Sequence, residues 1–282
     1  MEPNKRHTKP VYSPPNNIFS ELGTPNTVWA ISSVHGELEK LMSIHDAVFE
    51  RFRPGDRLVY LGNYTGHGEQ SRETIEEILL FRRLLLAQSG MKPDDIVYLK
   101  GKQEANWHTL MQVQFELFPV DCLLALYGAG MSKTLESYGI NPHDGIIAAK
   151  EGVHSMVKWV NDIRGRLKQN KGHECFMMAQ RRAAYTTLQN QRYPILFVNA
   201  GVDTNKSLED QQTSFWDTDI DFRDLHKRYD PFEKIIRGFD SSHSGVYLNG
   251  VSASLDGGCG FGGSLVCASM NALGDIDQLL EA

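Results

Sequence analysis

The sequence predicts an α/β fold. Three times between residues 27 and 104, a short β-prone run is followed by a loop of small or polar residues and then by a helical pattern. Between residues 193 and 270, further short apolar runs are separated by glycines, which is typical of a second sheet. Regular alternation of strand, loop and helix indicates a sheet whose strands are joined through helices.

Each of the three units has its own strand. The first strand covers residues 27–31 and leads into a helix over 38–49, where apolar side chains recur at every third or fourth position. A strand over 57–61 precedes a second amphipathic helix at 75–86, and a third strand covers 96–99. The loops that follow such strands lie along one edge of a sheet, so we expect them to converge on one site.

The middle of the chain, from about residue 105 to 190, is predicted to be a helical insertion. Helices are expected over residues 110–126, 132–138, 153–167 and 177–188, with glycine-containing segments between them. The chain then returns to a strand over 193–198. The insertion therefore separates an N-terminal group of strands from a C-terminal group.

The first 27 residues are predicted to form a disordered, proline-rich tail. Five of the eleven prolines lie there: Pro3, Pro10, Pro14, Pro15 and Pro25. Proline fixes φ and lacks an N–H donor, which disfavours both helices and central strands. Residues 28–282 are then expected to form one domain.

Composition excludes several classes of protein. The chain has 29 Lys and Arg residues against 35 Asp and Glu residues, a formal net charge of −6, which argues against a basic face that grips nucleic acid. No apolar run reaches the roughly 18 residues of a membrane span, and the N-terminus lacks the apolar stretch of a secretory signal. The cysteines (Cys122, Cys175, Cys259, Cys267) form no C-x-x-C pair. We therefore expect a cytoplasmic protein with reduced thiols that binds neither nucleic acid nor membranes.

The loops that end the predicted strands carry the functional information. In chain order they read Ser33-Val34-His35-Gly36, Gly62-Asn63-Tyr64-Thr65-Gly66-His67-Gly68, Gly101-Lys102-Gln103-Glu104, Asn199-Ala200-Gly201 and Gly238-Phe239-Asp240. Their order and spacing resemble the motifs GDxHG, GDxxDRG, GNHE, HAG and GHT of the calcineurin-like metallophosphoesterases, in the bacterial serine/threonine protein phosphatase (PPP) branch. Leu255–Leu265 is similar to the closing LDTGAxYGGxL segment of that family. The resemblance covers about residues 27–270.

The resemblance implies a four-layer α/β/β/α sandwich with a helical insertion and a two-metal active site. The family uses divalent ions such as manganese, or iron and zinc, to clamp a phosphate and activate water. The six metal-ligand positions fall on Ser33, His35, Asn63, Lys102, Asn199 and Phe239, and only His35 keeps the family's residue. We therefore expect no metal and no other cofactor.

The positions that assist catalysis in the family are also changed. The expected leaving-group acid, a histidine, is replaced by Gln103, which cannot deliver a proton at neutral pH. The Asp-Arg pair that helps to bind phosphate is replaced by Gly66 and His67, whereas Glu104 matches its motif. Asp240 is the last residue of the predicted pocket. None of the pocket residues is therefore predicted to be catalytic.

Lys102 adds a positive charge to the former active site. The alignment puts its ammonium group about where a metal ion would sit, and a cation there repels a divalent ion. Together with His67 and His35, Lys102 is the candidate for binding an anion.

Three functions are compatible with these replacements. The main hypothesis is an inactive phosphatase-like protein, a pseudophosphatase, that acts as a binding or regulatory module for a protein partner or a phosphorylated ligand. One alternative is a divergent but active metal-dependent phosphoesterase or protein phosphatase. The other is a metal-independent sensor of phosphoanions or nucleotides.

Overall fold

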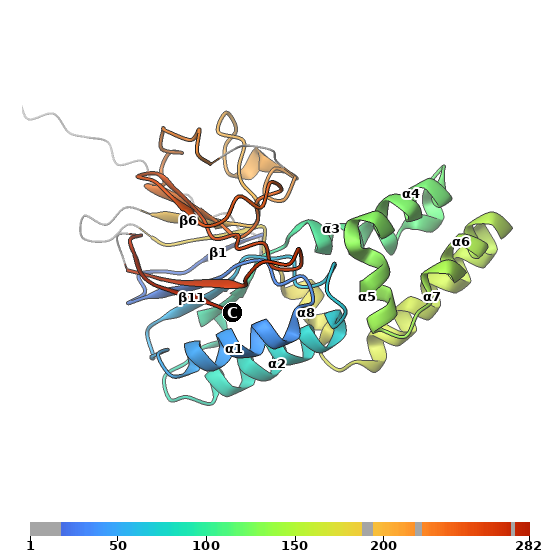
Figure 1. Ribbon diagram of the computed structural model, residues 1–282, viewed down its shortest axis with the longest axis horizontal. Coiled ribbons are helices and arrows are strands. Elements are labelled where there is room, and N and C mark those ends of the chain that lie inside the picture. Colours follow the sequence, from blue (N-terminus) through green and yellow to red (C-terminus); the bar gives the residue numbers. More distant parts are fainter. Residues whose placement is uncertain (1–17, 188–193, 218–221, 272–273) are drawn as a thin grey trace, which may run out of the picture.

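The computed structural model describes residues 18–187, 194–217, 222–271 and 274–282, and it shows two stacked β-sheets with a helical lobe at one side (Figure 1). The first sheet has the strand order β11-β10-β2-β3-β4. Its strands are β2 (Val28–Ile31), β3 (Arg57–Tyr60), β4 (Ile96–Tyr98), β10 (Val266–Met270) and β11 (Ile276–Glu281). The three predicted N-terminal strands, β2, β3 and β4, run parallel to one another, as expected from their helical connections.

The second sheet has the order β1-β5-β6-β7-β9-β8 and is also mixed. Its strands are β1 (Phe19–Glu21), β5 (Ala183–Tyr185), β6 (Ile195–Val198), β7 (Lys234–Arg237), β8 (Tyr247–Leu248) and β9 (Ser252–Ser254). The predicted C-terminal strands therefore do form a second sheet. Strands β6 and β7 are parallel, so the loops after them open at the same edge.

Successive apolar side chains along the strands of the first sheet point to opposite faces, and both faces are packed against other parts of the fold. Ala30 and Val59 face the second sheet and pack with Phe197 and Ile236. Side chains of alternate residues, such as Ile31, pack against α1 (Leu38–Phe49), α2 (Ser71–Leu86) and α8 (His173–Ala179). This alternation follows from the two-residue period of a strand.

The outer face of the second sheet is covered by irregular chain between β6 and β7. Buried aromatic residues of this segment, Phe215, Trp216 and Phe222, pack with Leu196 and Ile235 of the sheet. The regular element described within it is the short 3₁₀ helix η4 (Glu209–Gln211). The predicted sandwich is thus observed, but within the described residues this outer layer consists of turns rather than α-helices.

The helical lobe, residues 113–169, projects away from the sandwich (Figure 1). It follows α3 (Lys102–Leu110) and contains η2 (Val113–Phe115), α4 (Pro119–Leu126), η3 (Tyr127–Met131), α5 (Ser132–Ser137), α6 (Pro142–Glu151) and α7 (Val153–Gln169). A core of its own, which includes Leu123, Leu135, Val160 and Ile163, holds these helices together. The predicted helix over 110–126 is interrupted, because α4 begins only at Pro119, a residue suited to the first turn of a helix.

Two further predictions about secondary structure are wrong. The tail was expected to extend to residue 27, but Phe19–Glu21 form β1, which pairs with β5, and Leu22 is buried. The helix expected over 177–188 ends at Ala179, and Ala183–Tyr185 form β5. Both strands depend on partners far away in the sequence, which a local pattern does not reveal. Residues 1–17 and 188 lie outside the described part of the chain.

No helix of the described residues is long and apolar enough to cross a membrane.

Candidate functional site

The structure brings the loops after β2, β3, β4, β6 and β7 together at one edge of the sandwich. Backbone hydrogen bonds join them directly: the N–H of His35 donates to the carbonyl of Asn63 at 2.8 Å, and that of Ser33 to Gly238 at 3.1 Å. The N–H of Gly238 in turn donates to the carbonyl of Asn199 at 2.9 Å. The loops named in the sequence therefore form one site, which we call the strand-end site.

Neutral polar side chains occupy the centre of this site. The Asn63 amide donates to Ser33 Oγ at 3.2 Å and lies 3.5 Å from Asn199 Oδ1. The Asn199 amide donates to the carbonyl of Leu61 at 2.6 Å, and Asn63 Oδ1 accepts the N–H of Gln103 at 3.0 Å. Ser33, Asn63 and Asn199 are at most 2% exposed. Ser33, Asn63 and Asn199 thus form hydrogen bonds with one another and with nearby backbone.

Glu104 holds two of the loops in place. Its buried carboxylate accepts the N–H groups of Asn63 at 2.9 Å, Tyr64 at 3.0 Å and Gly101 at 2.8 Å. Burial raises the pKa of Glu104, and these backbone donors oppose the increase. Glu104 therefore acts on the shape of the loops, since its oxygens point to backbone.

His35 is enclosed by rings, and it is the one residue that matches among the six positions that the resemblance assigns to metal ligands. The residue is 1% exposed, and ring centroids of His67, Phe239 and Phe261 lie 5.3, 5.6 and 5.3 Å from its own. Neither ring nitrogen has a hydrogen-bond partner among the described residues.

The surroundings of His35 keep its imidazole neutral. Burial lowers the pKa of His35 to about 3, and the positive potentials of His67 and His243 add to the decrease, while the Thr65 backbone opposes it. A neutral buried imidazole offers no positive charge to an anion. His35 therefore lies in the predicted pocket, but its charge state does not suit the anion-binding role expected for it.

The rings around His35 also contact one another. Phe261 contacts His243 with ring centroids 3.9 Å apart and His67 with centroids 4.3 Å apart. Burial lowers the pKa of His67, with a smaller contribution from His243. The sequence reasoning missed Phe261, although it lies in the glycine-rich closing segment that carried the resemblance.

Lys102 and Gln103 point in different directions at the start of α3. The Lys102 ammonium is 2.9 Å from Asp217 Oδ1, and its side chain is 43% exposed, so it lies on the rim and not in the expected metal position. The Gln103 amide donates to the carbonyl of Ala129 at 2.7 Å and so ties the site to the helical lobe. At Gly66 an added Cβ would lie 2.9 Å from Gln103, which leaves little space for a larger residue.

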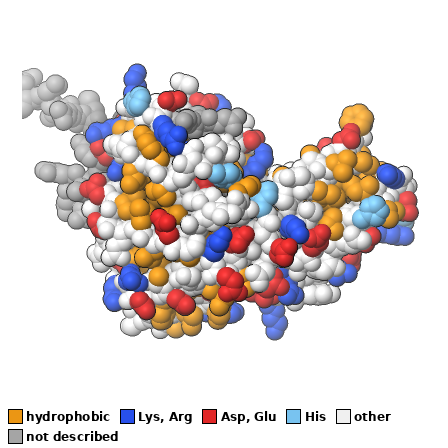
Figure 2. Space-filling view, in the orientation of Figure 1, with side chains coloured by type: hydrophobic (Ala, Val, Ile, Leu, Met, Phe, Trp, Pro, Cys, Tyr) orange, Lys and Arg blue, Asp and Glu red, His pale blue; other side chains and the backbone are white. Residues whose placement is uncertain are grey.

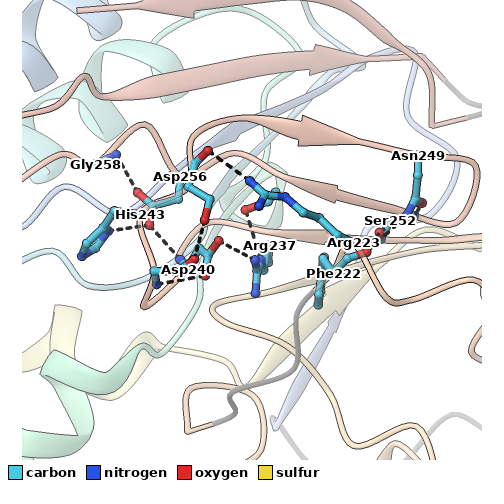
Figure 3. A network of polar contacts seen from close by, with 12 residues as sticks. Phe222, Arg223, Arg237, Asp240, His243, Asn249, Ser252, Asp256 and Gly258 are labelled. Carbon is cyan, nitrogen blue, oxygen red and sulfur yellow. Dashed lines mark hydrogen bonds and ion pairs between the residues drawn. The ribbon is translucent and has the colours of Figure 1, made fainter.

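Asp240 belongs to a buried polar network beside the site (Figure 3). Its carboxylate pairs with Arg237 at 2.9 Å, and its N–H donates to Asp256 at 2.8 Å. Asp256 also accepts from the N–H of Gly258 and lies 3.0 Å from His243 Nδ1. Asp240 is thus engaged by Arg237. The Asp256–His243 pair was not predicted, because its two residues are thirteen positions apart and lie in different loops.

The donor set of the strand-end site does not fit a two-metal centre. Bridging between two divalent ions requires an anionic oxygen ligand, and Asn63 supplies a neutral amide instead. Phe239 has no donor atom, and the Lys102 ammonium has no lone pair to offer. Within the described residues, no group of three His, Cys, Asp or Glu side chains is arranged to hold a metal ion.

Solved structures match the chain in fold, whereas no protein-family model and no curated protein matches it. A structure described as a candidate diadenosine tetraphosphatase is 13% identical, with a TM-score of 0.52, and the match covers 93% of this chain and 98% of that chain. A cold-active protein tyrosine phosphatase is 9% identical, with a TM-score of 0.50, over 92% of this chain and 80% of that chain. At these identities the likeness shows the fold alone. The chain therefore has a phosphatase-like α/β sandwich fold, as its motifs predict.

Proposed function

We propose that this protein is a pseudophosphatase, a phosphatase-like protein without catalytic activity that acts as a binding or regulatory module. One observation carries the proposal: of the six positions that the resemblance assigns to metal ligands, only His35 keeps the family's residue, and Ser33, Asn63 and Asn199 are hydrogen-bonded to one another instead.

The chemistry of phosphate-ester hydrolysis supports this proposal. Two-metal hydrolysis needs ligands that hold both ions, a metal-activated water and a proton for the leaving group. Asn63 cannot bridge two ions as a carboxylate does, and both ends of its amide already have partners. Gln103 has no proton to give at neutral pH, and its amide is bonded to Ala129.

Exposed apolar side chains support a protein as the partner. Phe115, Leu117, Phe118 and Leu124, near the start of the helical lobe, are 82%, 83%, 67% and 56% exposed. Figure 2 shows hydrophobic side chains gathered over the projecting lobe. Apolar groups of this size, close together on a surface, are typical of places where another macromolecule binds.

The proposal is tested by metal content and turnover of the purified full chain. After incubation with excess Mn²⁺ and gel filtration, we expect metal well below one ion per chain, and no hydrolysis of p-nitrophenyl phosphate above the protein-free rate. The His35→Ala variant should behave identically, because His35 has no metal to bind.

Two results would overturn the proposal. One is two bound metal ions per chain. The other is Mn²⁺-dependent turnover that is lost in His35→Ala but kept in Lys102→Ala, whose side chain lies on the rim. Circular dichroism of both variants shows whether a loss of turnover reflects unfolding.

A further inference from the structure

A cavity of about 330 Å³ lies at the outer edge of the first sheet, away from the strand-end site. It is bounded by β4, α2, α8 and the 3₁₀ helix η1 (Pro93–Asp95). None of the residues at the former metal-ligand positions lines it. This volume is at the small end of the range for ligand pockets, so the cavity suits a molecule with about one ring rather than a peptide.

Two guanidinium groups give this cavity its charge. Arg82 from α2 and Arg181, which follows α8, both line it, and neither forms an ion pair within the described residues. Arg82 has a long contact of 3.5 Å to the carbonyl of Ile96, and Arg181 donates to the carbonyl of Ala179 at 2.8 Å. Each guanidinium has five N–H donors, so most remain available to a ligand. Asp94, on the exposed side, is the one acidic residue in the lining.

Tyr98, on β4, adds a buried hydroxyl to the lining of this cavity. The residue is 5% exposed, and its hydroxyl has no hydrogen-bond partner among the described residues. The guanidinium carbon of Arg82 is 5.9 Å from the centre of the Tyr98 ring. Burial raises the pKa of Tyr98, and the charge and polar side chain of Arg82 oppose that rise. A buried donor without a partner costs about 1–3 kcal/mol, so its presence calls for an explanation.

Apolar side chains complete the lining. Leu79 from α2, Ile96 from β4 and Phe176 from α8 face the same cavity. Phe176 and Tyr98 are also in edge-to-face contact, with centroids 4.9 Å apart. The cavity thus combines a cationic side with an apolar side, which matches a small molecule that has an anionic group and a ring.

We propose that this cavity binds a small phosphate monoester, with Arg82 and Arg181 holding the phosphate, the Tyr98 hydroxyl donating to it, and the organic part lying against Leu79 and Phe176. Two guanidiniums match a doubly charged phosphate better than a single carboxylate, and their planar donor pairs fit phosphate oxygens. The site is separate from the strand-end site and does not depend on the proposed function.

Cys175 provides a local probe of occupancy. Its thiol is exposed and lines the cavity, whereas Cys259 and Cys267 are buried. In a Cys122→Ser background, the rate of Cys175 alkylation by iodoacetamide is measured by peptide mass spectrometry, with phenyl phosphate, inorganic phosphate or benzoate present. We expect phenyl phosphate to slow labelling several-fold at saturation, inorganic phosphate to do so only at higher concentration, and benzoate to have the least effect.

Variants then locate the binding. Arg82→Ala and Arg181→Ala should each weaken protection by phenyl phosphate about tenfold or more, whereas Arg83→Ala, an exposed neighbour that does not line the cavity, should leave it unchanged. Tyr98→Phe should weaken binding without lowering the melting temperature of the free protein, because the variant removes an unpartnered hydroxyl.

The proposal is overturned if no probe protects Cys175, or if protection survives both arginine substitutions. Stronger protection by benzoate than by phenyl phosphate would also contradict it, since it would indicate a carboxylate site. None of these outcomes changes metal content or turnover, so they leave the test of the proposed function independent.

Discussion

Glu104 shows at the scale of one residue how the strand-end loops keep their shape. Its carboxylate takes up three backbone N–H groups, and the residue is 4% exposed. Glu104→Ala leaves these donors buried without an acceptor, so we expect the free energy of unfolding to fall by about 3 kcal/mol or more. Urea denaturation followed by circular dichroism measures the change.

Glu104→Gln and Glu69→Ala are the controls for this prediction. The glutamine keeps one acceptor oxygen but brings an NH₂ group against backbone donors, so its loss of stability should be intermediate. Glu69 is largely exposed in its pair with Lys133, and its removal should change stability little. Equal stability of Glu104→Ala and the parent would show that the hydrogen bonds contribute nothing.

The convergence of the strand-end loops could be predicted from the sequence, but the environment of their side chains could not. The motif positions predicted that Ser33, Asn63 and Asn199 would meet, and they do. The direction of the Lys102 side chain depends on Asp217, which is 115 positions further along the chain. The neutral state of His35 likewise depends on rings such as Phe261 that arrive from other loops, and a single sequence carries no information on such contacts.

At the scale of elements, the predictions that succeeded rest on local patterns. The strands near residues 28, 57 and 96, and helices α1 and α2, have strong apolar periodicity of their own. Strands β1 and β5 have three residues each and are stabilised by their parallel pairing with each other, 164 positions apart. Long-range pairing of this kind overrides local propensity, which explains why both strands were missed.

Helix α4 offers a matched test of the apolar surface of the lobe. Leu123 is fully buried in the lobe core, and Leu124, the next residue, is 56% exposed. Leu123→Ala should lower the free energy of unfolding by about 2–5 kcal/mol because it leaves a cavity. Leu124→Ala should change it by less than about 0.5 kcal/mol. Urea denaturation of both variants distinguishes them, and similar losses would mean that Leu124 is packed inside the folded protein.

At the scale of the whole molecule, buried histidines couple folding to pH. His45 is a buried residue of α1. His173 is the first residue of α8, and its Nδ1 is 2.7 Å from the Tyr138 hydroxyl of the lobe. Burial lowers the pKa of both and brings that of His173 to about 4; the nearby charge of Arg72 adds to the decrease at His173. The folded protein therefore keeps these imidazoles neutral, as it does His35, under conditions in which the unfolded chain binds protons.

The sign of the effect follows from proton linkage. Because the folded-state pKa lies below the unfolded value of 6.5, stability from His173 is fully present above pH 6.5 and is lost as pH falls from 6.5 toward 4. Between pH 8 and pH 5 this single residue should lower the free energy of unfolding by about 2 kcal/mol. Urea denaturation at a series of pH values measures how steeply the free energy of unfolding depends on pH.

The variants locate this dependence. His173→Gln should have a shallower slope against pH, by up to one proton, whereas His108→Gln, at an exposed position on α3, should keep the parent's slope. An identical slope in His173→Gln and the parent would show that His173 is already protonated in the folded protein or is accessible to solvent, and it would place the acid sensitivity of the fold elsewhere.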